Sequence, residues 1–146
     1  MHMIELTTPA SLEKVQLGVI AVRNIAAAYY QIVTGKVPGE ENVFLDSVEL
    51  AAGEACTNAV KYSPAGKAEA HRLQVCFALE EDYLVVMIKD QNAAFDFATV
   101  MPPDFAETPE SGYGIYLMKE TMDEVSYQRK DGWNILKLKK RFGTGE

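Results

Sequence analysis

The stretch that decides the fold runs from Val48 to Pro64 and reads V-E-L-A-A-G-E-A-C-T-N-A-V-K-Y-S-P. At about 100° per residue, its apolar side chains form one broad arc together with one preceding residue. This arc consists of Leu45, Val48, Ala52, Ala55, Cys56, Ala59 and Val60. A narrow polar line beside it holds Ser47, Glu54, Asn58 and Lys61. The pattern predicts an amphipathic helix that projects Glu54 and Asn58 from the margin of its buried face.

Glu54 and Asn58 lie one helical turn apart, so they can share one small ligand. The amide oxygen of asparagine can bind a hard cation, and the carboxylate of glutamate can accept a proton. Small residues such as Gly53 and Ala55 leave space around the pair. The alternative is an ordinary amphipathic helix with polar residues at its edge, so the functional interpretation depends on the motifs that follow.

Two elements are predicted before this helix. Residues Ile4 to Thr8 suit a short edge strand. A long helix then starts at Thr8-Pro9 or Ser11, and it stops at Gly35 and Pro38. Its apolar repeat favours core packing over a coiled-coil seam, and consists of Leu12, Val15, Val19, Val22, Ala26, Tyr29 and Val33. The central helix then begins near residues 41–46, where acidic side chains suit a helix N-terminus, and ends near Ser63-Pro64.

Two strands are predicted after the central helix. Residues 73–79 alternate between apolar and other side chains, as in a half-buried strand, before a turn at 80–82. The run Y-L-V-V-M-I at 83–88 is continuously apolar, which indicates a central strand covered on both faces. Asp90 lies at the end of that strand.

The C-terminal third contains a loop, a helix and a hairpin. Residues 91–111 show no periodicity and contain three prolines, and loops of this length are usually functional or disordered. S-G-Y-G at 111–114 then opens a helix, so Gly112 and Gly114 would offer backbone N–H groups to an anion. The alternative is a plain loop-to-helix turn. Asp131-Gly132 predicts a type I′ turn between the last two strands.

The composition suits one domain that spans residues 1–146, with a hydrophobic content of 48% and a formal net charge of -7. This charge argues against a duplex-binding surface, and no basic cluster suggests an anionic membrane. No apolar run approaches the roughly 20 residues of a membrane span, and the N-terminus has no signal-peptide pattern, so we expect a cytoplasmic protein. The order of elements predicts a two-layer α+β sandwich, with a mixed, mainly antiparallel sheet and its helices on one face.

Cysteine and histidine are scarce. Cys56 falls on the predicted central helix and Cys76 in a strand, which fits two buried free thiols better than a disulfide. With only His2 and His71 in addition, we expect no zinc cluster.

Three motifs together resemble a known set. They are E-A-C-T-N at 54–58, D-Q-N-A-A-F-D at 90–96, and S-G-Y-G-I-Y-L-M at 111–118 ahead of M-D-E-V at 122–125. The set resembles that of the GHKL (Bergerat-fold) ATPases and, more closely, that of the anti-sigma-factor serine/threonine kinases of bacterial partner-switching modules. The resemblance covers nearly the whole chain. Its specificity comes from the order of three motifs, since each is weak alone.

The resemblance implies a role for each matching residue. Glu54 matches the general base that accepts the proton of the attacking hydroxyl, and Asn58 matches the residue that coordinates Mg²⁺ against the phosphates of ATP. Asp90 matches the carboxylate that accepts a hydrogen bond from the adenine amino group. Residues 97–111 match the ATP lid. Positions implied to bind the nucleotide are Asn58, Lys61, Asp90, Asn92, Phe95, Gly112, Tyr113 and Gly114.

The chain departs from the family pattern at two places. Asn92 stands where the family commonly has glycine, and the lid lacks Lys and Arg but carries Asp104, Glu107 and Glu110. Mg²⁺ and backbone amides could offset the phosphate charge without help from the lid. Alternatively, Lys61 or Lys119 could supply the positive charge that the lid lacks.

Three functions remain open. The favoured one is a serine/threonine kinase that binds a sigma factor or comparable regulator, phosphorylates its STAS-type antagonist and forms a homodimer. The second is a nucleotide-binding switch that sequesters its partner without phosphoryl transfer. The third, ranked lowest, is the ATP-binding half of a histidine kinase, because the sequence contains no helical phosphoacceptor segment.

Overall fold

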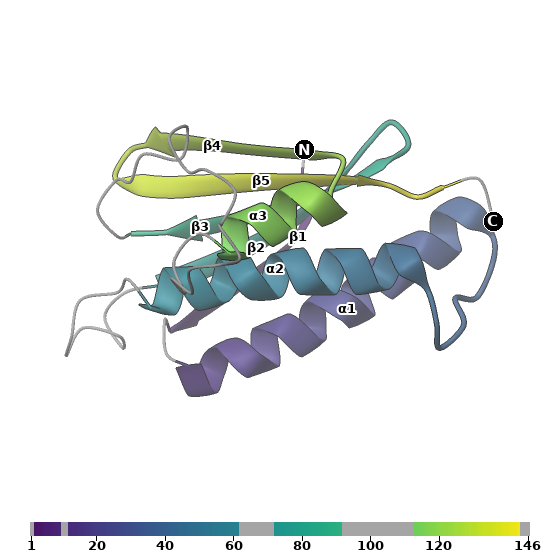
Figure 1. Cartoon of the computed structure of the whole chain (residues 1–146), viewed down its shortest axis with the longest axis horizontal. Coiled ribbons are helices and arrows are strands. Elements are labelled where there is room, and N and C mark those ends of the chain that lie inside the picture. The colour runs from purple at the N-terminus through teal and green to yellow at the C-terminus, as the bar shows by residue number, and fades with distance from the viewer. Residues whose placement is uncertain (1, 10–11, 62–71, 92–112, 144–146) are drawn as a thin grey trace, which may run out of the picture.

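Three helices lie against one face of a five-stranded sheet (Figure 1). The structure is a computed structural model, and it describes residues 2–9, 12–61, 72–91 and 113–143. Its elements are β1 (His2–Pro9), α1 (Leu12–Thr34), α2 (Val43–Lys61), β2 (Arg72–Glu80), β3 (Tyr83–Asp90), α3 (Tyr113–Thr121), β4 (Glu124–Lys130) and β5 (Trp133–Arg141). This arrangement confirms the predicted two-layer α+β class.

The sheet has the strand order β1-β2-β3-β5-β4, and all its described neighbours are antiparallel. β3 is central, as predicted, and Leu84, Val86 and Ile88 are buried toward the helices. No described element covers its other face, which carries Met87 and Lys89, so the prediction that both faces are covered is wrong. β1 and β4 are the two edge strands. Asp131 and Gly132 both have positive φ, 54° and 82°, which is the requirement of a type I′ turn, so this prediction is confirmed.

The central helix α2 is held between α1 and α3 above the sheet. The backbone N–H of Leu45 donates to Oδ1 of Asn42 over 2.9 Å, so Asn42 caps the helix just before Val43. The predicted apolar arc is buried, with Val60 at its half-buried margin. Ser47 was predicted on a polar line and is instead buried, because α2 is covered on both sides by helices. Glu54 and Asn58, on the same line, are half-buried.

Helix α1 buries part of the predicted repeat. Val15, Val22, Ala26 and Tyr29 are in the core. Val33 was predicted there but is 41% exposed, and Tyr30 is buried in its place because the packed face drifts around a helix of 23 residues.

An ion pair ties the two long helices together. A guanidinium nitrogen of Arg23 on α1 lies 2.7 Å from Oε2 of Glu49 and 2.9 Å from Oδ1 of Asp46, both on α2. Hydrogen bonds to Asp46 and then Glu49 raise the pKa of Arg23 above its ordinary value. This contact explains the acidic residue that interrupts the apolar side of α2.

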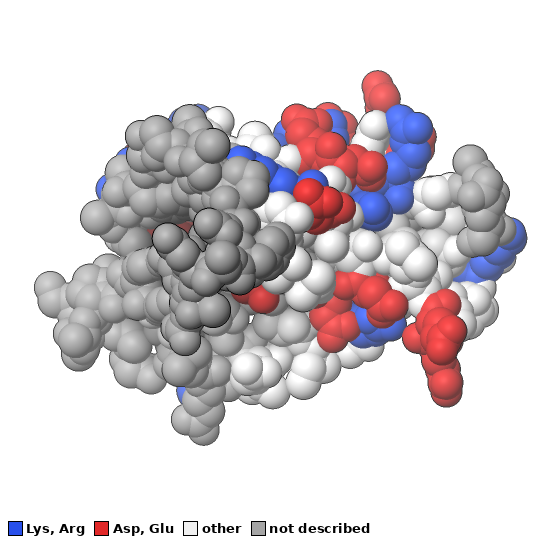
Figure 2. All heavy atoms as spheres, in the orientation of Figure 1, with Lys and Arg blue, Asp and Glu red and all other residues white. Residues whose placement is uncertain are grey.

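The outer side of α1 exposes large apolar side chains among polar ones such as Gln16 and Asn24. Leu17, Ile20 and Ile32 are 68%, 59% and 75% exposed, and Figure 2 shows little charge over this helix. The segment Lys14–Thr34 is long and apolar enough to cross a membrane by length and composition, and 22% of its most apolar window is buried. The sequence-based expectation that no run reaches this length is therefore wrong for this segment. The core helix of a soluble protein and a signal sequence near an N-terminus both pass the same test, and α1 packs on α2 and β1.

Both cysteines are free and buried, as predicted. Burial raises the pKa of the Cys56 thiol to about 12. Burial is also the main cause that raises the pKa of the Cys76 thiol. Thiols with raised pKa values carry little thiolate at neutral pH, so both cysteines are structural rather than reactive.

Candidate functional site

Two predicted motifs meet where α2 passes the first turn of α3. A Cβ atom added to Gly114 would lie 3.0 Å from Oε2 of Glu54 and 3.1 Å from Nδ2 of Asn58. Both side chains are half-buried, and they project from one face of α2 because they are four residues apart. The structure therefore brings together Glu54, Asn58 and Gly114, which the sequence analysis assigned to one site, and the roles implied for them remain predictions.

Glycine at position 114 lets the first turn of α3 approach Glu54 and Asn58 closely. A methyl group there would crowd the carboxylate of Glu54 and the amide of Asn58. Backbone N–H groups of the first helical turn have no partner within the helix, so this end of α3 suits an anion. Oxygen donors beside helix amides are groups that a magnesium-phosphate ligand requires.

The orientation of the Asn58 amide matters for a metal. Its Nδ2 lies nearer than Oδ1 to the Cβ position at Gly114, at 3.1 Å against 3.6 Å. Rotation about the last side-chain bond exchanges the two atoms and would present the oxygen. Among the described residues, no group of three or more His, Cys, Asp or Glu could hold a metal. One protein oxygen together with phosphates and water is a common arrangement for Mg²⁺, so Asn58 fits this role.

Asp90 ends β3 on the face that carries buried Ile88, which is the face covered by the helices. Its Oδ1 accepts a hydrogen bond of 2.8 Å from Nδ2 of Asn134. The two residues are direct neighbours on β3 and β5. Asp90 itself is half-buried, so its carboxylate is held in place while remaining accessible.

Asn134 is a site residue that the sequence analysis missed. It is 2% exposed, and its Oδ1 accepts hydrogen bonds from the Tyr127 hydroxyl and from a guanidinium nitrogen of Arg129, the latter at 2.9 Å. With Oδ1 engaged by two donors, the amide is oriented so that Nδ2 faces Asp90. The sequence offered one local signal, because a type I′ turn at 131–132 pairs Arg129 with Asn134 on the face that carries Leu136 and Leu138, but it gave no sign of the contact with Asp90.

Several predicted residues lie outside the described part of the chain. These are Asn92, Phe95, Gly112 and the lid at 97–111. Tyr113 begins α3 and Lys61 ends α2, but their side chains are not described. The roles implied for these residues remain predictions.

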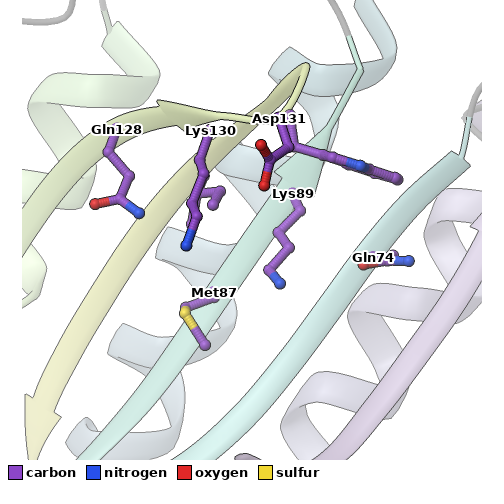
Figure 3. Close-up of a pocket in the computed structure, with 8 residues that line it drawn as sticks. Gln74, Met87, Lys89, Gln128, Lys130 and Asp131 are labelled. Carbon is purple, nitrogen blue, oxygen red and sulfur yellow. The ribbon is translucent and has the colours of Figure 1, made fainter.

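A hollow of about 470 Å³ lies elsewhere, on the sheet face opposite the helices (Figure 3). The residues that line it, such as Met87 and Ile135, are sequence neighbours of residues that face the core, such as Ile88 and Asn134. Successive side chains of a strand point to opposite faces of the sheet. It is therefore separated from Glu54, Asn58 and Gly114 by the thickness of the sheet.

Comparison with known proteins identifies the family. Residues 9–140 match the histidine kinase-like ATPase domain. The serine-protein kinase RsbW of Bacillus cereus (strain AH187) is 32% identical over 103 residues, which are 65% of this chain and 63% of that protein. RsbW of Bacillus mycoides (strain KBAB4) gives the same identity and coverage. The chain thus matches less than two thirds of the length of these relatives.

Solved structures agree at the level of the fold. The RsbU and RsbW domains of Rv1364c from Mycobacterium tuberculosis match 95% of this chain with a TM-score of 0.55 and 15% identity, over 32% of that chain. The histidine kinase domain of a blue-light activated kinase from Erythrobacter litoralis EL346 matches 85% of this chain and 61% of its own, also with a TM-score of 0.55 and 15% identity. With the matching family domain across most of its length, the chain belongs to the histidine kinase-like ATPase family.

Proposed function

We propose that this protein is an ATP-dependent serine/threonine kinase of the anti-sigma-factor type, which binds a sigma factor or comparable regulator and phosphorylates a STAS-type antagonist. The observation that carries the proposal is the meeting of Glu54 and Asn58 with Gly114 at the first turn of α3. A protein that only binds nucleotide has no need of a carboxylate at the position of the base. The similarity to serine-protein kinases RsbW supports the same class.

Each residue has a chemical task in this proposal. Asn58 would hold Mg²⁺, which offsets the charge of the ATP phosphates when bound, and the first turn of α3 would donate N–H groups to them. Glu54 would accept the hydroxyl proton of a substrate serine. At the same time the serine oxygen would bond to the γ-phosphorus of ATP, and the bond between that phosphorus and the oxygen that leaves with ADP would break. The serine hydroxyl is a poor nucleophile, so removal of its proton is the step that requires the protein.

Asp90 would accept a hydrogen bond from the exocyclic amine of adenine. One of its oxygens already accepts from Asn134, which fixes the plane of the carboxylate. A held acceptor loses little freedom when the base binds, and this favours adenine over a base that has oxygen in place of the amine.

The partners and location follow from the resemblance and from the named relatives. A kinase of this type would act in transcription regulation in the cytoplasm. Its partner surface would be separate from the nucleotide, and it would require no direct contact with nucleic acid, in keeping with a net charge of -7.

A second candidate is a nucleotide-dependent switch without phosphoryl transfer. The acidic lid composition favours it, because Asp104, Glu107 and Glu110 would oppose the phosphates and no lid Lys or Arg offsets them. In that case bound ATP would stabilise a partner-binding surface, and Glu54 would take no part in chemistry.

The deciding experiment incubates the protein with γ-labelled ATP and each STAS-domain protein of the same genome. Glu54→Gln should keep Mg-ATP binding while transfer falls by about 10²–10⁴-fold, because it keeps shape and removes basicity. Asn58→Ala should weaken both binding and transfer. Glu41→Gln, at an exposed position before α2, serves as the matched control. Wild-type transfer that Glu54→Gln leaves intact would show that the base is wrongly assigned, whereas binding without any transfer would favour the switch.

The proposal includes a homodimer. β1 is an edge strand whose outer side has no described strand beside it, and unpaired edges invite pairing. α1 packs on β1 and exposes the apolar side chains of Leu17, Ile20 and Ile32, here called the stripe. A second copy related by a two-fold axis could cover both features at once, because the stripe and the edge belong to one side of the molecule.

Light scattering tests this assembly. The wild type should have a dimer mass at micromolar concentration. Ile20→Glu should give a monomer with a similar thermal midpoint, because Ile20 lies outside the core, while Gln16→Glu, also exposed on α1, should remain dimeric. A monomeric wild type would contradict the proposal.

A further inference from the structure

The sheet face opposite the helices divides into two halves with different chemistry. No described element covers this face, and it carries the outward side chains of β2, β3, β5 and β4. One half lies near the β2–β3 turn, around Glu80 and Tyr83. The other half lies near the β4–β5 turn and contains the hollow of about 470 Å³.

The half near Glu80 satisfies its own charges. Nζ of Lys139 lies 2.9 Å from Oε1 of Glu80, and Nζ of Lys137 lies 3.5 Å from Oε2 of the same carboxylate. The hydrogen bond from Lys139 is the main cause that lowers the pKa of Glu80. Arg141 lies 3.3 Å from Asp82 and above the ring of Tyr83. These contacts leave this half with little attraction for a charged partner.

The hollow is different, because its cations have no such partners. Lys89 and Lys130 both line it, and neither forms an ion pair with any residue that the structure describes. Figure 3 shows both side chains extending toward Met87. The carboxylate of Asp131 also lines the hollow, so two lysines against one aspartate leave the lining with a formal charge of +1. In a chain with net charge -7, this excess makes the hollow a local site for negative charge at the two lysines.

Between the two ammonium groups the floor is apolar. It is formed by Met87, Ile135 and Trp133, all half-buried on adjacent strands. Lys89 is opposite Ile135, and Lys130 is opposite Trp133. From strand spacings of about 4.8 Å and a rise of about 3.3 Å per residue, the Cα atoms of Lys89 and Lys130 are about 12 Å apart.

We propose that this hollow binds an extended acidic segment of a partner protein, with one apolar side chain on the floor and a carboxylate at each lysine. A separation of about 12 Å corresponds to side chains four residues apart in an extended chain. Two cations are too few for a nucleic acid backbone, which typically engages about 6–10 phosphate contacts. The site goes beyond the proposed kinase activity, because the sheet separates it from Glu54 and Asn58.

The chain carries its own reporter for this site. Trp133 is its single tryptophan and lines the hollow, so its fluorescence should respond to occupancy. The probe is a blocked peptide Glu-Gly-Leu-Gly-Glu, titrated into the full protein. The peptides Lys-Gly-Leu-Gly-Lys and Glu-Gly-Ser-Gly-Glu test charge and the apolar anchor separately, and a short oligothymidylate tests nucleic acid.

The acidic leucine peptide should give a saturable change at millimolar concentration, and the other probes should bind more weakly. Lys89→Gln and Lys130→Gln should each weaken it about two- to five-fold, as expected for exposed charge pairs. Lys137→Gln, on the same face but paired with Glu80, is the matched control and should leave binding unchanged. Absence of a saturable signal, equal loss with Lys137→Gln, or tighter binding of the oligothymidylate would overturn the proposal.

Discussion

Asn134→Leu is the substitution that best tests how the site recognises the adenine base of the nucleotide. It keeps the approximate volume of a side chain that is 2% exposed, and it removes the 2.8 Å hydrogen bond to Oδ1 of Asp90. It also removes the acceptor that Tyr127 and Arg129 share. The carboxylate of Asp90 would then lose the hydrogen bond that orients it toward a bound adenine.

The expected change in ATP affinity follows from the hydrogen bond that Asp90 loses. A hydrogen bond to a charged group contributes about 1.5–3 kcal/mol, and part of this will be lost from the folded protein itself. If about 1.4 kcal/mol is lost at the nucleotide, the dissociation constant for ATP rises about tenfold. ITP has an oxygen in place of the adenine amine, so it gains nothing from an oriented Asp90. Its affinity should change by less than about threefold.

Calorimetric titration of the wild type and the variant with ATP and with ITP measures how much each dissociation constant changes. Asn24→Leu is the matched control, because Asn24 is exposed on α1. Tyr127→Phe removes one donor to Asn134 and should give a smaller change in the same direction. Equal weakening of ATP and ITP would indicate general damage to the fold, and unchanged ATP affinity would refute the positioning role of Asn134.

Three further outcomes are expected. Gly114→Ala should weaken Mg-ATP about fivefold or more, since its Cβ would lie 3.0 Å from Glu54 and 3.1 Å from Asn58; unchanged affinity in a calorimetric titration would place the phosphates elsewhere. Tyr29→Phe should raise the free energy of unfolding in urea by about 1 kcal/mol, because the buried hydroxyl has no hydrogen-bond partner among the described residues; a clear loss would mean that it has one. Burial raises the pKa of the Cys56 thiol from 9.0 to about 12, so the thiol loses its proton at lower pH in the unfolded state than in the folded state. The free energy of unfolding should therefore fall as pH rises from about 9 to 12. Cys56→Ala should flatten that decline, and a slope that the substitution leaves unchanged would contradict this reasoning.

The sequence could predict the elements that rest on local patterns. The spacing of Glu54 and Asn58 placed both on one side of α2, and the turn residues at 131–132 fixed the last hairpin. The position of Gly114 followed from its place before an apolar helix. These features depend on helix periodicity and turn geometry, which are properties of neighbouring residues.

Other features depend on contacts between distant segments, and the sequence pattern could not show them. The ion pair of Glu49 with Arg23 joins residues 26 positions apart, so no local pattern indicates it. Ser47 lies on the same line as Glu54, yet its burial depends on how closely the neighbouring helices pack. Asn134 was missed because its partner Asp90 is 44 residues away, and only the strand order β3-β5-β4 places Asp90, Asn134 and Arg129 side by side.

The most direct test of the account is the thermal midpoint of unfolding in the presence of Mg-ATP. If Glu54, Asn58 and Gly114 surround a magnesium-phosphate site, ligand at 100 times its dissociation constant should stabilise the wild type by about 2.7 kcal/mol. For a domain of this size that is a rise of about 5–10 °C, and Asn58→Ala should show a much smaller rise at the same concentration. A wild-type midpoint that does not move at millimolar Mg-ATP would contradict the proposed site and, with it, both the kinase and the switch.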